Sequence, residues 1–107
     1  MKNDHRVIIV QDDKIFSASY SNIIVIPTTS FEPKKHWDSQ NNRLKYVTHH
    51  LLHKSQYSEL KRDTIVKCEQ LFTIEKRFLD RYLFTLNNDD MEEILKRIAL
   101  VLGFNRI

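Results

Sequence analysis

A segment around residues 31 to 46 combines cations with aromatic rings, the pairing that proteins use to hold single-stranded RNA. It contains the run Lys34-Lys35-His36-Trp37, with Phe31 before it and Arg43, Lys45 and Tyr46 after it. Cations of this kind hold phosphates, while the rings stack on bases. The structural alternative is a charged loop whose Trp37 side chain folds back onto the core, because aromatic residues in loops commonly act as anchors.

Three histidines, His49, His50 and His53, are close enough in the sequence to suggest a metal site. On a strand, however, His49 and His53 share one face and His50 points to the other. No cysteine or carboxylate stands beside them at ligand spacing. We therefore expect no metal and no cofactor, and we interpret the three histidines as a solvated, polar strand edge.

Hydroxyl, basic and acidic side chains gather at two further places. Thr28-Thr29-Ser30 follows a proline, where local hydrogen bonds from the hydroxyls can satisfy the end of a strand. Lys67 and Glu69 are two residues apart, so on a strand they share a face and can form an exposed ion pair of little energetic value. Cys68 between them then points to the opposite face and is expected in the core.

These side chains need strands to position them. Residues 6–11 and 22–27 are β-branched runs without alternation, which places both in the middle of a sheet. We expect the second to end at Pro27, which cannot donate to a strand ladder. Residues 28–43 have no periodicity and are typical of a long surface loop. Further strands are predicted over residues 44–52 and 64–68, while residues 71–74 and 78–86 are compatible with strands, a short helix or both.

The C-terminal segment has the pattern of a helix. Asp89, followed three residues later by Glu92, is typical of an N-cap with a capping-box partner. One apolar stripe at helical spacing follows, made of Met91, Ile94, Leu95, Ile98 and Leu102. Gly103, the only glycine, stands where a helix end favours a left-handed residue. Strands followed by a helix predict an α+β fold, a small and strongly bent antiparallel sheet or partial barrel in one domain over residues 1–107.

Composition narrows the classes of function. The 107 residues are 41% hydrophobic and 29% charged, the balance of one folded domain. A net charge of +3 is compatible with an anionic partner without requiring one. The longest apolar runs, residues 7–10 and 23–26, have the length of strands and not of membrane-spanning helices. A single cysteine and the lack of a signal-peptide pattern favour the cytoplasm.

Three blocks, taken in order, resemble the MazF/PemK family of toxin ribonucleases. They are residues 7–13, residues 24–30 and the most specific block, residues 60–79. Thr48-His49 also falls where the family often has Thr-His before an edge strand. The resemblance implies a MazF-like barrel, usually a homodimer neutralised by a cognate antitoxin, that cuts single-stranded mRNA at short sequences without a metal.

The chemistry that this resemblance implies is attack of a ribose 2′-hydroxyl on the adjacent phosphate. One group must accept the hydroxyl proton, another must protonate the leaving 5′-oxygen, and a cation or donors must offset the added phosphate charge. The family pattern places Thr29 at the scissile phosphate and Lys67 and Glu69 beside the cleavage site. Contacts to RNA are expected from Ser30, Lys34, Lys35, Trp37, Gln70 and Thr73.

Two departures from the family pattern remove positive charge near the phosphate. The family's Arg-Pro pair corresponds to His5-Arg6, so either His5 supplies acid–base chemistry or Arg6 replaces the arginine after a one-residue shift. Such a shift reverses the face on which a strand side chain lies. The arginine that often stands in the third block is Phe72.

The leading hypothesis is therefore a sequence-specific endoribonuclease toxin. Two alternatives stay open. One is a non-catalytic relative that binds RNA or protein and has lost the arginine. The other is a shortened chain whose missing first strand leaves an open sheet edge, which invites pairing with another chain.

Overall fold

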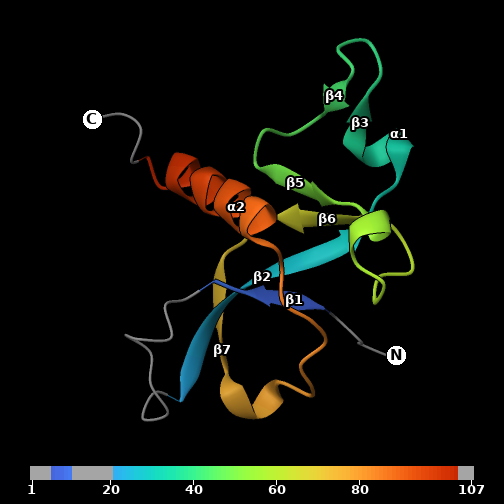
Figure 1. The fold of residues 1–107 in the computed structure, drawn as a ribbon. Coiled ribbons are helices and arrows are strands. Elements are labelled where there is room, and N and C mark those ends of the chain that lie inside the picture. Colours follow the sequence, from blue (N-terminus) through green and yellow to red (C-terminus); the bar gives the residue numbers. More distant parts are fainter. Residues whose placement is uncertain (1–5, 11–20, 104–107) are drawn as a thin grey trace.

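The computed structural model describes residues 6–10 and 21–103, which form an antiparallel sheet covered by one long helix (Figure 1). The main sheet has the strand order β1-β2-β6-β5, and β7 also pairs with β2. Its strands are β1 (Val7–Ile9), β2 (Asn22–Ser30), β5 (His49–Leu52), β6 (Thr64–Lys67) and β7 (Phe72–Glu75). An arm contains α1 (Pro33–His36), β3 (Trp37–Asp38) and β4 (Arg43–Leu44). Two single-turn helices, η1 (Lys54–Gln56) and η2 (Lys76–Phe78), precede α2 (Asn88–Val101).

β2 is longer than predicted, because it passes through Pro27. The Thr28 N–H donates to the Arg6 carbonyl at 3.3 Å, on the β1 edge of β2. Successive N–H groups of a strand alternate between its edges, so the donor that Pro27 lacks would face β6 and β7. β6 pairs with residues 28–30 of β2, and β7 pairs with residues 22–25. The residues that connect β6 to β7 do not pair with β2, so no strand lies opposite Pro27 on this edge. The prediction that the strand ends at Pro27 is wrong, because the neighbouring strand is interrupted where the donor is missing.

The α+β class is confirmed, and β2 gives the sheet its bent form. One part of β2 pairs with β1 and β7, and its last residues pair with β6, which also pairs with β5. Among the described residues the sheet is not closed into a barrel. The single strand predicted over residues 44–52 is wrong, because β4 ends at Leu44 and a connection of four residues precedes β5.

The core lies between the sheet and α2. A cluster of buried side chains fills this space: Ile26, Leu52, Tyr57, Leu60, Val66, Cys68 and Ile94. The prediction that Cys68 is a core residue is confirmed. The apolar stripe of α2 is narrower than predicted, since Leu95 and Leu102 are 48% and 55% exposed. Only the centre of the stripe, Ile94 and Ile98, packs against the cluster.

The helix begins two residues earlier than predicted. The Asn87 side chain accepts a hydrogen bond from the Asp90 N–H at 2.8 Å, so Asn87 and not Asp89 is the N-cap of α2. Asparagine and aspartate are both preferred N-cap residues, and this segment contains several of them, so residue type alone does not identify the cap. The expectation for Gly103 is confirmed, because its φ is 81°.

Replacing Asn87 by alanine is expected to lower the free energy of unfolding by about 1 kcal/mol, because one N–H of the first helical turn loses its acceptor. Chemical denaturation measures this change. Asn88→Ala is the matched control, since Asn88 is exposed and is the first residue of the helix. Equal losses in the two variants would contradict the assignment of the cap.

Candidate functional site

The sheet brings three functional side chains to one face. Thr29 on β2 pairs with Ile65 on β6, and Lys67 on β6 pairs with His49 on β5. Paired residues of antiparallel strands share a face, as do residues two apart. Thr29, Lys67 and His49 therefore lie on the same face of three adjacent strands. The opposite face carries His50 and the core side chains that meet α2.

A hollow of about 360 Å³ lies on this face beside Lys67. Its lining comes from the start of the arm, from the connection before β5, and from the end of β6: Lys35, His36, Tyr46, Thr48, His49, Lys67 and Glu69. Two cations, one carboxylate and two imidazoles thus surround a space that can take part of a nucleotide. No other described hollow has this combination of groups.

His49 is the most enclosed polar side chain of this hollow, with 5% of its surface exposed. Its Nε2 lies 3.7 Å from a carboxylate oxygen of Glu69, and its ring packs 5.0 Å from the Tyr46 ring. Burial lowers the pKa of His49 below its usual 6.5, and the positive charge of Lys67 acts in the same direction. Glu69 opposes this shift only in part. His49 is therefore neutral near pH 7 and able to accept a proton.

His36 is held in one tautomer beside His49. Its Nδ1 accepts the Glu32 N–H at 2.9 Å, so the proton of the neutral ring is on Nε2. The ring stacks on Phe31 and meets the His49 ring edge-on, with 5.8 Å between the ring centroids. His36 is only 6% exposed. The arm therefore supplies a fixed hydrogen-bond donor to the hollow.

The sequence pattern assigns no catalytic role to His36 or His49. The interpretation of a solvated strand edge is wrong for His49, which is buried, and for His50, whose Nε2 lies 2.7 Å from a carboxylate oxygen of Asp90. It holds only for His53, which is exposed and follows β5. The one available signal was Thr48-His49 at a family-like position, because the register with Lys67 is a property of the folded sheet.

Three of the five predicted catalytic positions belong to this face, one lies elsewhere, and one is not described. Lys67 and Glu69 line the hollow, and Thr29 lies diagonally across from Lys67. Glu69 directs its carboxylate toward the His49 Nε2, which corrects the expected pairing with Lys67. Arg6 is exposed and lies along the other edge of β2, where its carbonyl accepts from the Thr28 hydroxyl at 2.9 Å. His5 lies outside the described residues.

Of the predicted RNA contacts, only Lys35 lines the hollow. Lys34 is exposed nearby in α1, and Gln70 follows Glu69 in the turn after β6. Ser30 is exposed at the end of β2, but it shares the face of Thr28, opposite to Thr29 and Lys67. Trp37 is half-buried against Phe31, edge to face, which supports its role as an anchor of the arm. Thr73 is separated from the hollow, because it pairs with Ile24 near the start of β2.

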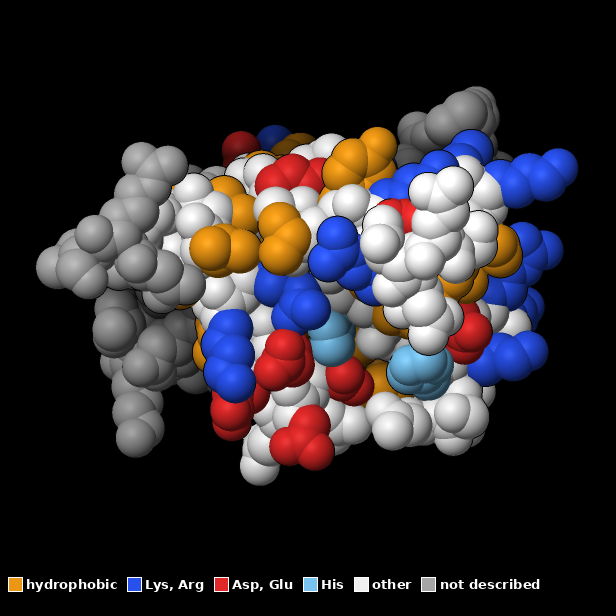
Figure 2. Space-filling model, turned by 90° about the horizontal axis from the view of Figure 1, so that it is seen from above, with side chains coloured by type: hydrophobic (Ala, Val, Ile, Leu, Met, Phe, Trp, Pro, Cys, Tyr) orange, Lys and Arg blue, Asp and Glu red, His pale blue; other side chains and the backbone are white. Residues whose placement is uncertain are grey.

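Basic side chains extend the site toward the arm. Seen from above, Lys and Arg side chains gather at the right-hand edge of the molecule, on the side where α1, β3 and β4 lie (Figure 2). Four exposed cations occur in or next to these elements: Lys34, Lys35, Arg43 and Lys45. This surface favours an anionic chain that enters the hollow from the arm.

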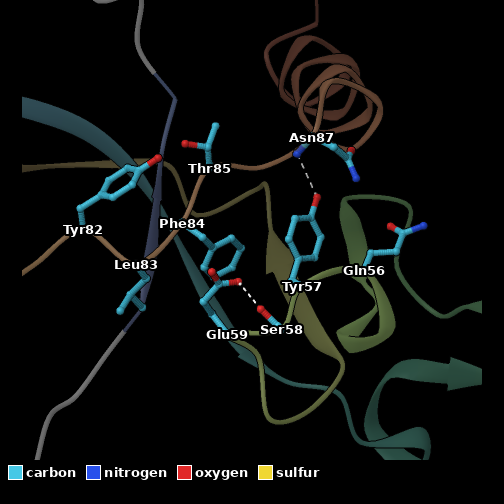
Figure 3. A pocket seen from close by; sticks show the side chains of 9 residues that line it. All are labelled: Gln56, Tyr57, Ser58, Glu59, Tyr82, Leu83, Phe84, Thr85 and Asn87. Carbon is cyan, nitrogen blue, oxygen red and sulfur yellow. Dashed lines mark hydrogen bonds between the residues drawn. The ribbon is translucent and has the colours of Figure 1, made fainter.

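A second and larger hollow, of about 590 Å³, has a different character (Figure 3). It lies between the η1 turn and the segment before α2, and its lining residues are Gln56, Tyr57, Ser58, Glu59, Tyr82, Leu83, Phe84, Thr85 and Asn87. Glu59 is the only charged residue among them. A hollow with a carboxylate and no cation does not favour phosphate, so the smaller hollow is the candidate site.

Within residues 6–10 and 21–103, no group of three or more His, Cys, Asp or Glu side chains is placed to hold a metal ion. In the same residues, no helix has the length and apolar character to cross a membrane.

Comparison with known proteins gives one family and one fold. Residues 1–102 match the family described as PemK-like, MazF-like toxin of type II toxin-antitoxin system. An endoribonuclease solved in complex with its cognate antitoxin, from Mycobacterial species, has a TM-score of 0.67 at 18% identity, covering 91% of this chain and 79% of its own. The Mycobacterium tuberculosis toxin MazF-mt6 has a TM-score of 0.67 at 16% identity, covering 90% of this chain and 83% of its own. At such identities the likeness is one of fold.

Proposed function

The chain belongs to the family of PemK-like, MazF-like toxins of type II toxin–antitoxin systems, and from this premise we propose that it is a metal-independent endoribonuclease. The substrate is single-stranded mRNA, cut at a short sequence. The observation that carries this proposal is the row formed by Thr29, Lys67 and His49 across one sheet face, beside a hollow that also contains Glu69. A phosphate bound to Lys67 would have the Thr29 hydroxyl on one side, and His49 and Glu69 on the other.

Each group has a role in attack by the ribose 2′-hydroxyl. The Lys67 ammonium offsets the charge that the phosphate gains as the new bond forms. The Thr29 hydroxyl donates to a phosphate oxygen and fixes its position. Glu69 supplies the carboxylate that stabilises positive charge during proton transfer. Cleavage leaves a 2′,3′-cyclic phosphate and a 5′-hydroxyl, and no step in this route requires a metal ion.

Binding of the RNA chain beyond the cleaved bond is assigned to the arm. The exposed cations of the arm, together with Gln70, would hold phosphates on either side of the hollow. Tyr46 offers an exposed ring at its rim, suited to stacking on a base. Trp37 stabilises the arm by packing against Phe31, and the exposed part of its ring would contact the RNA.

The partners follow from the family. We assign to this chain a cognate antitoxin that neutralises it, a homodimeric state and a cytoplasmic location, where mRNA is available. The solved endoribonuclease named above forms a complex with its own antitoxin. An acidic antitoxin segment laid over the basic arm would block the entry of RNA by charge and by volume.

A cleavage assay in the presence of EDTA tests the function. Wild-type protein should cut a mixed-sequence RNA to cyclic-phosphate and 5′-hydroxyl ends, and Thr29→Ala should cut at least 10-fold more slowly. Thr28→Ala is the matched control, because its hydroxyl is bonded to the Arg6 carbonyl and belongs to the other face. Intact RNA after incubation with folded wild-type protein would reject the endoribonuclease.

A second function is favoured by the exposed Phe72, which stands where the family often has an arginine. A chain that has lost this charge can keep the basic arm and bind RNA without cutting it. Retardation of RNA in a gel, with no cleavage over the same period, would establish this binding module. Cleavage that Thr29→Ala abolishes would eliminate it.

A further inference from the structure

The buried polar side chains of the described residues are His36 and His49, and both line the hollow beside Lys67. Buried imidazoles are unfavourable unless their nitrogens find partners. His36 has the Glu32 N–H on its Nδ1. The Nδ1 of His49 is buried and has no hydrogen-bond partner within the described part of the chain. A group kept in this state beside a phosphate-binding lysine calls for a functional explanation.

We propose that His49 is the general base of the reaction, taking the proton of the attacking ribose 2′-hydroxyl on its Nε2. This inference rests on the proposed endoribonuclease function and adds to it a catalytic residue. Nε2 is the nitrogen on the Glu69 side, while Nδ1 is enclosed by protein. Lys67 is the cross-strand partner of His49, so a phosphate held by the lysine lies next to the imidazole.

The step is balanced without a metal or a co-reactant. The 2′-hydroxyl proton moves to Nε2 while the 2′-oxygen forms its bond to phosphorus, and the bond from phosphorus to the 5′-oxygen breaks. The leaving 5′-oxygen takes a proton from water, and the imidazolium returns its proton to solvent. The RNA chain becomes a cyclic phosphate and a 5′-hydroxyl, with no net change in protons.

The surroundings of His49 suit a residue that is neutral before the step and charged during it. Burial and the charge of Lys67 keep the ring neutral in the free protein, and burial is the larger cause. Once a proton is taken from the substrate, the Glu69 carboxylate 3.7 Å away stabilises the imidazolium. His36, with its Nδ1 occupied, is a positioning residue that packs edge-on against the base.

The pH dependence is set by every charged or titratable group around His49. These groups are Lys35 and His36 from α1, Tyr46 from the preceding connection, and Lys67 and Glu69 from the end of β6. Arg97 of α2 donates to the His49 carbonyl at 2.9 Å. Because the pKa of His49 is lowered, kcat/KM should fall on the acidic side through a value below 6.5. At pH values between that midpoint and 6.5, His49 is still mostly neutral and can accept the proton.

The test measures the rate of metal-free cleavage against pH for wild type, His49→Gln and His53→Gln. In His49→Gln we expect a loss of 100- to 10,000-fold, roughly the contribution of a positioned general base, together with disappearance of the acidic limb. His53→Gln should keep both the rate and the limb, because His53 is exposed and lies outside the hollow. Circular dichroism shows whether each variant is folded.

The outcomes separate this inference from the function on which it rests. Wild-type cleavage with a fast His49→Gln variant and an unchanged acidic limb would overturn the role of His49 and leave the endoribonuclease intact. Absence of wild-type cleavage would overturn both. If His49→Gln does not fold, the wild-type profile decides. An acidic limb with its midpoint below 6.5 supports the base, and a cleavage rate that does not fall on acidification, down to the lowest pH at which the protein stays folded, rejects it.

Discussion

Replacing Lys67 by methionine is expected to lower the rate of metal-free RNA cleavage by roughly 100- to 1,000-fold. Methionine keeps much of the length of the lysine stem, so the packing between β5 and β6 should persist while the charge is lost. Lys67 is the cation of the hollow that pairs in register with His49, and β6 carries no other positively charged side chain that could replace it. Single-turnover cleavage in EDTA, with saturating protein, measures the chemical step.

The same variant should also move the pH profile. Lys67 is one of the groups that lower the pKa of His49, so the acidic limb of any residual activity should shift to higher pH. Lys61→Met is the matched control, because Lys61 is exposed and lies before β6, outside the hollow. Equal rates for the two variants would show that Lys67 does not hold the scissile phosphate. Lys67→Arg should recover part of the rate, since the charge returns in a different shape.

Replacing Asp90 by alanine is expected to lower the free energy of unfolding by about 3 kcal/mol, the largest effect on stability that we predict. One carboxylate oxygen lies 2.7 Å from the Nε2 of His50, and the other accepts the hydroxyl of Tyr57. The side chains of His50 and Asp90 are each 13% exposed. Removing the carboxylate leaves two part-buried polar groups without this partner, at the place where α2 meets β5 and the η1 turn.

The Tyr57 hydroxyl also accepts the Asn87 N–H at 3.1 Å, so the network reaches the N-cap of α2 (Figure 3). Burial and the bond to Asp90 raise the pKa of Tyr57 to about 12, which keeps the hydroxyl protonated and able to donate at neutral pH. Urea denaturation followed by circular dichroism measures the change. Asp89→Ala is the control, because Asp89 is exposed in the same helical turn and its loss should lower stability by no more than about 1 kcal/mol. A smaller loss for Asp90→Ala than for Asp89→Ala would show that the network does not hold the helix.

Several parts of this protein could be predicted from its sequence because they depend on neighbouring residues. The apolar runs of β2 and β6 are strands, as their β-branched residues indicate, and the C-terminal segment is a helix with an apolar face. Gly103 ends it in the left-handed conformation that favours glycine. The blocks that resemble MazF/PemK proteins point to the same family as the match over residues 1–102. Each of these features is encoded within one segment.

Other features depend on which segments meet, and there the sequence pattern was insufficient. Pro27 does not end β2, because the chain between β6 and β7 leaves the strand opposite its missing donor. Asn87, not Asp89, caps α2, because the Asn87 side chain accepts the N–H of Asp90. The Asp90 carboxylate is used elsewhere, since it accepts the hydroxyl of Tyr57.

The candidate site shows the same division. Residue types and the family pattern identified Thr29, Lys67 and Glu69, and the Thr-His pair marked His49 without assigning it a role. Only the register of β5 on β6 brings His49 next to Lys67, and only the arm encloses it. That register comes from packing and hydrogen bonds between strands distant in sequence, and a shift by one residue would turn His50 to this face and His49 to the core. The sequence therefore determined which chemical groups are available, and the tertiary structure decided which of them act together.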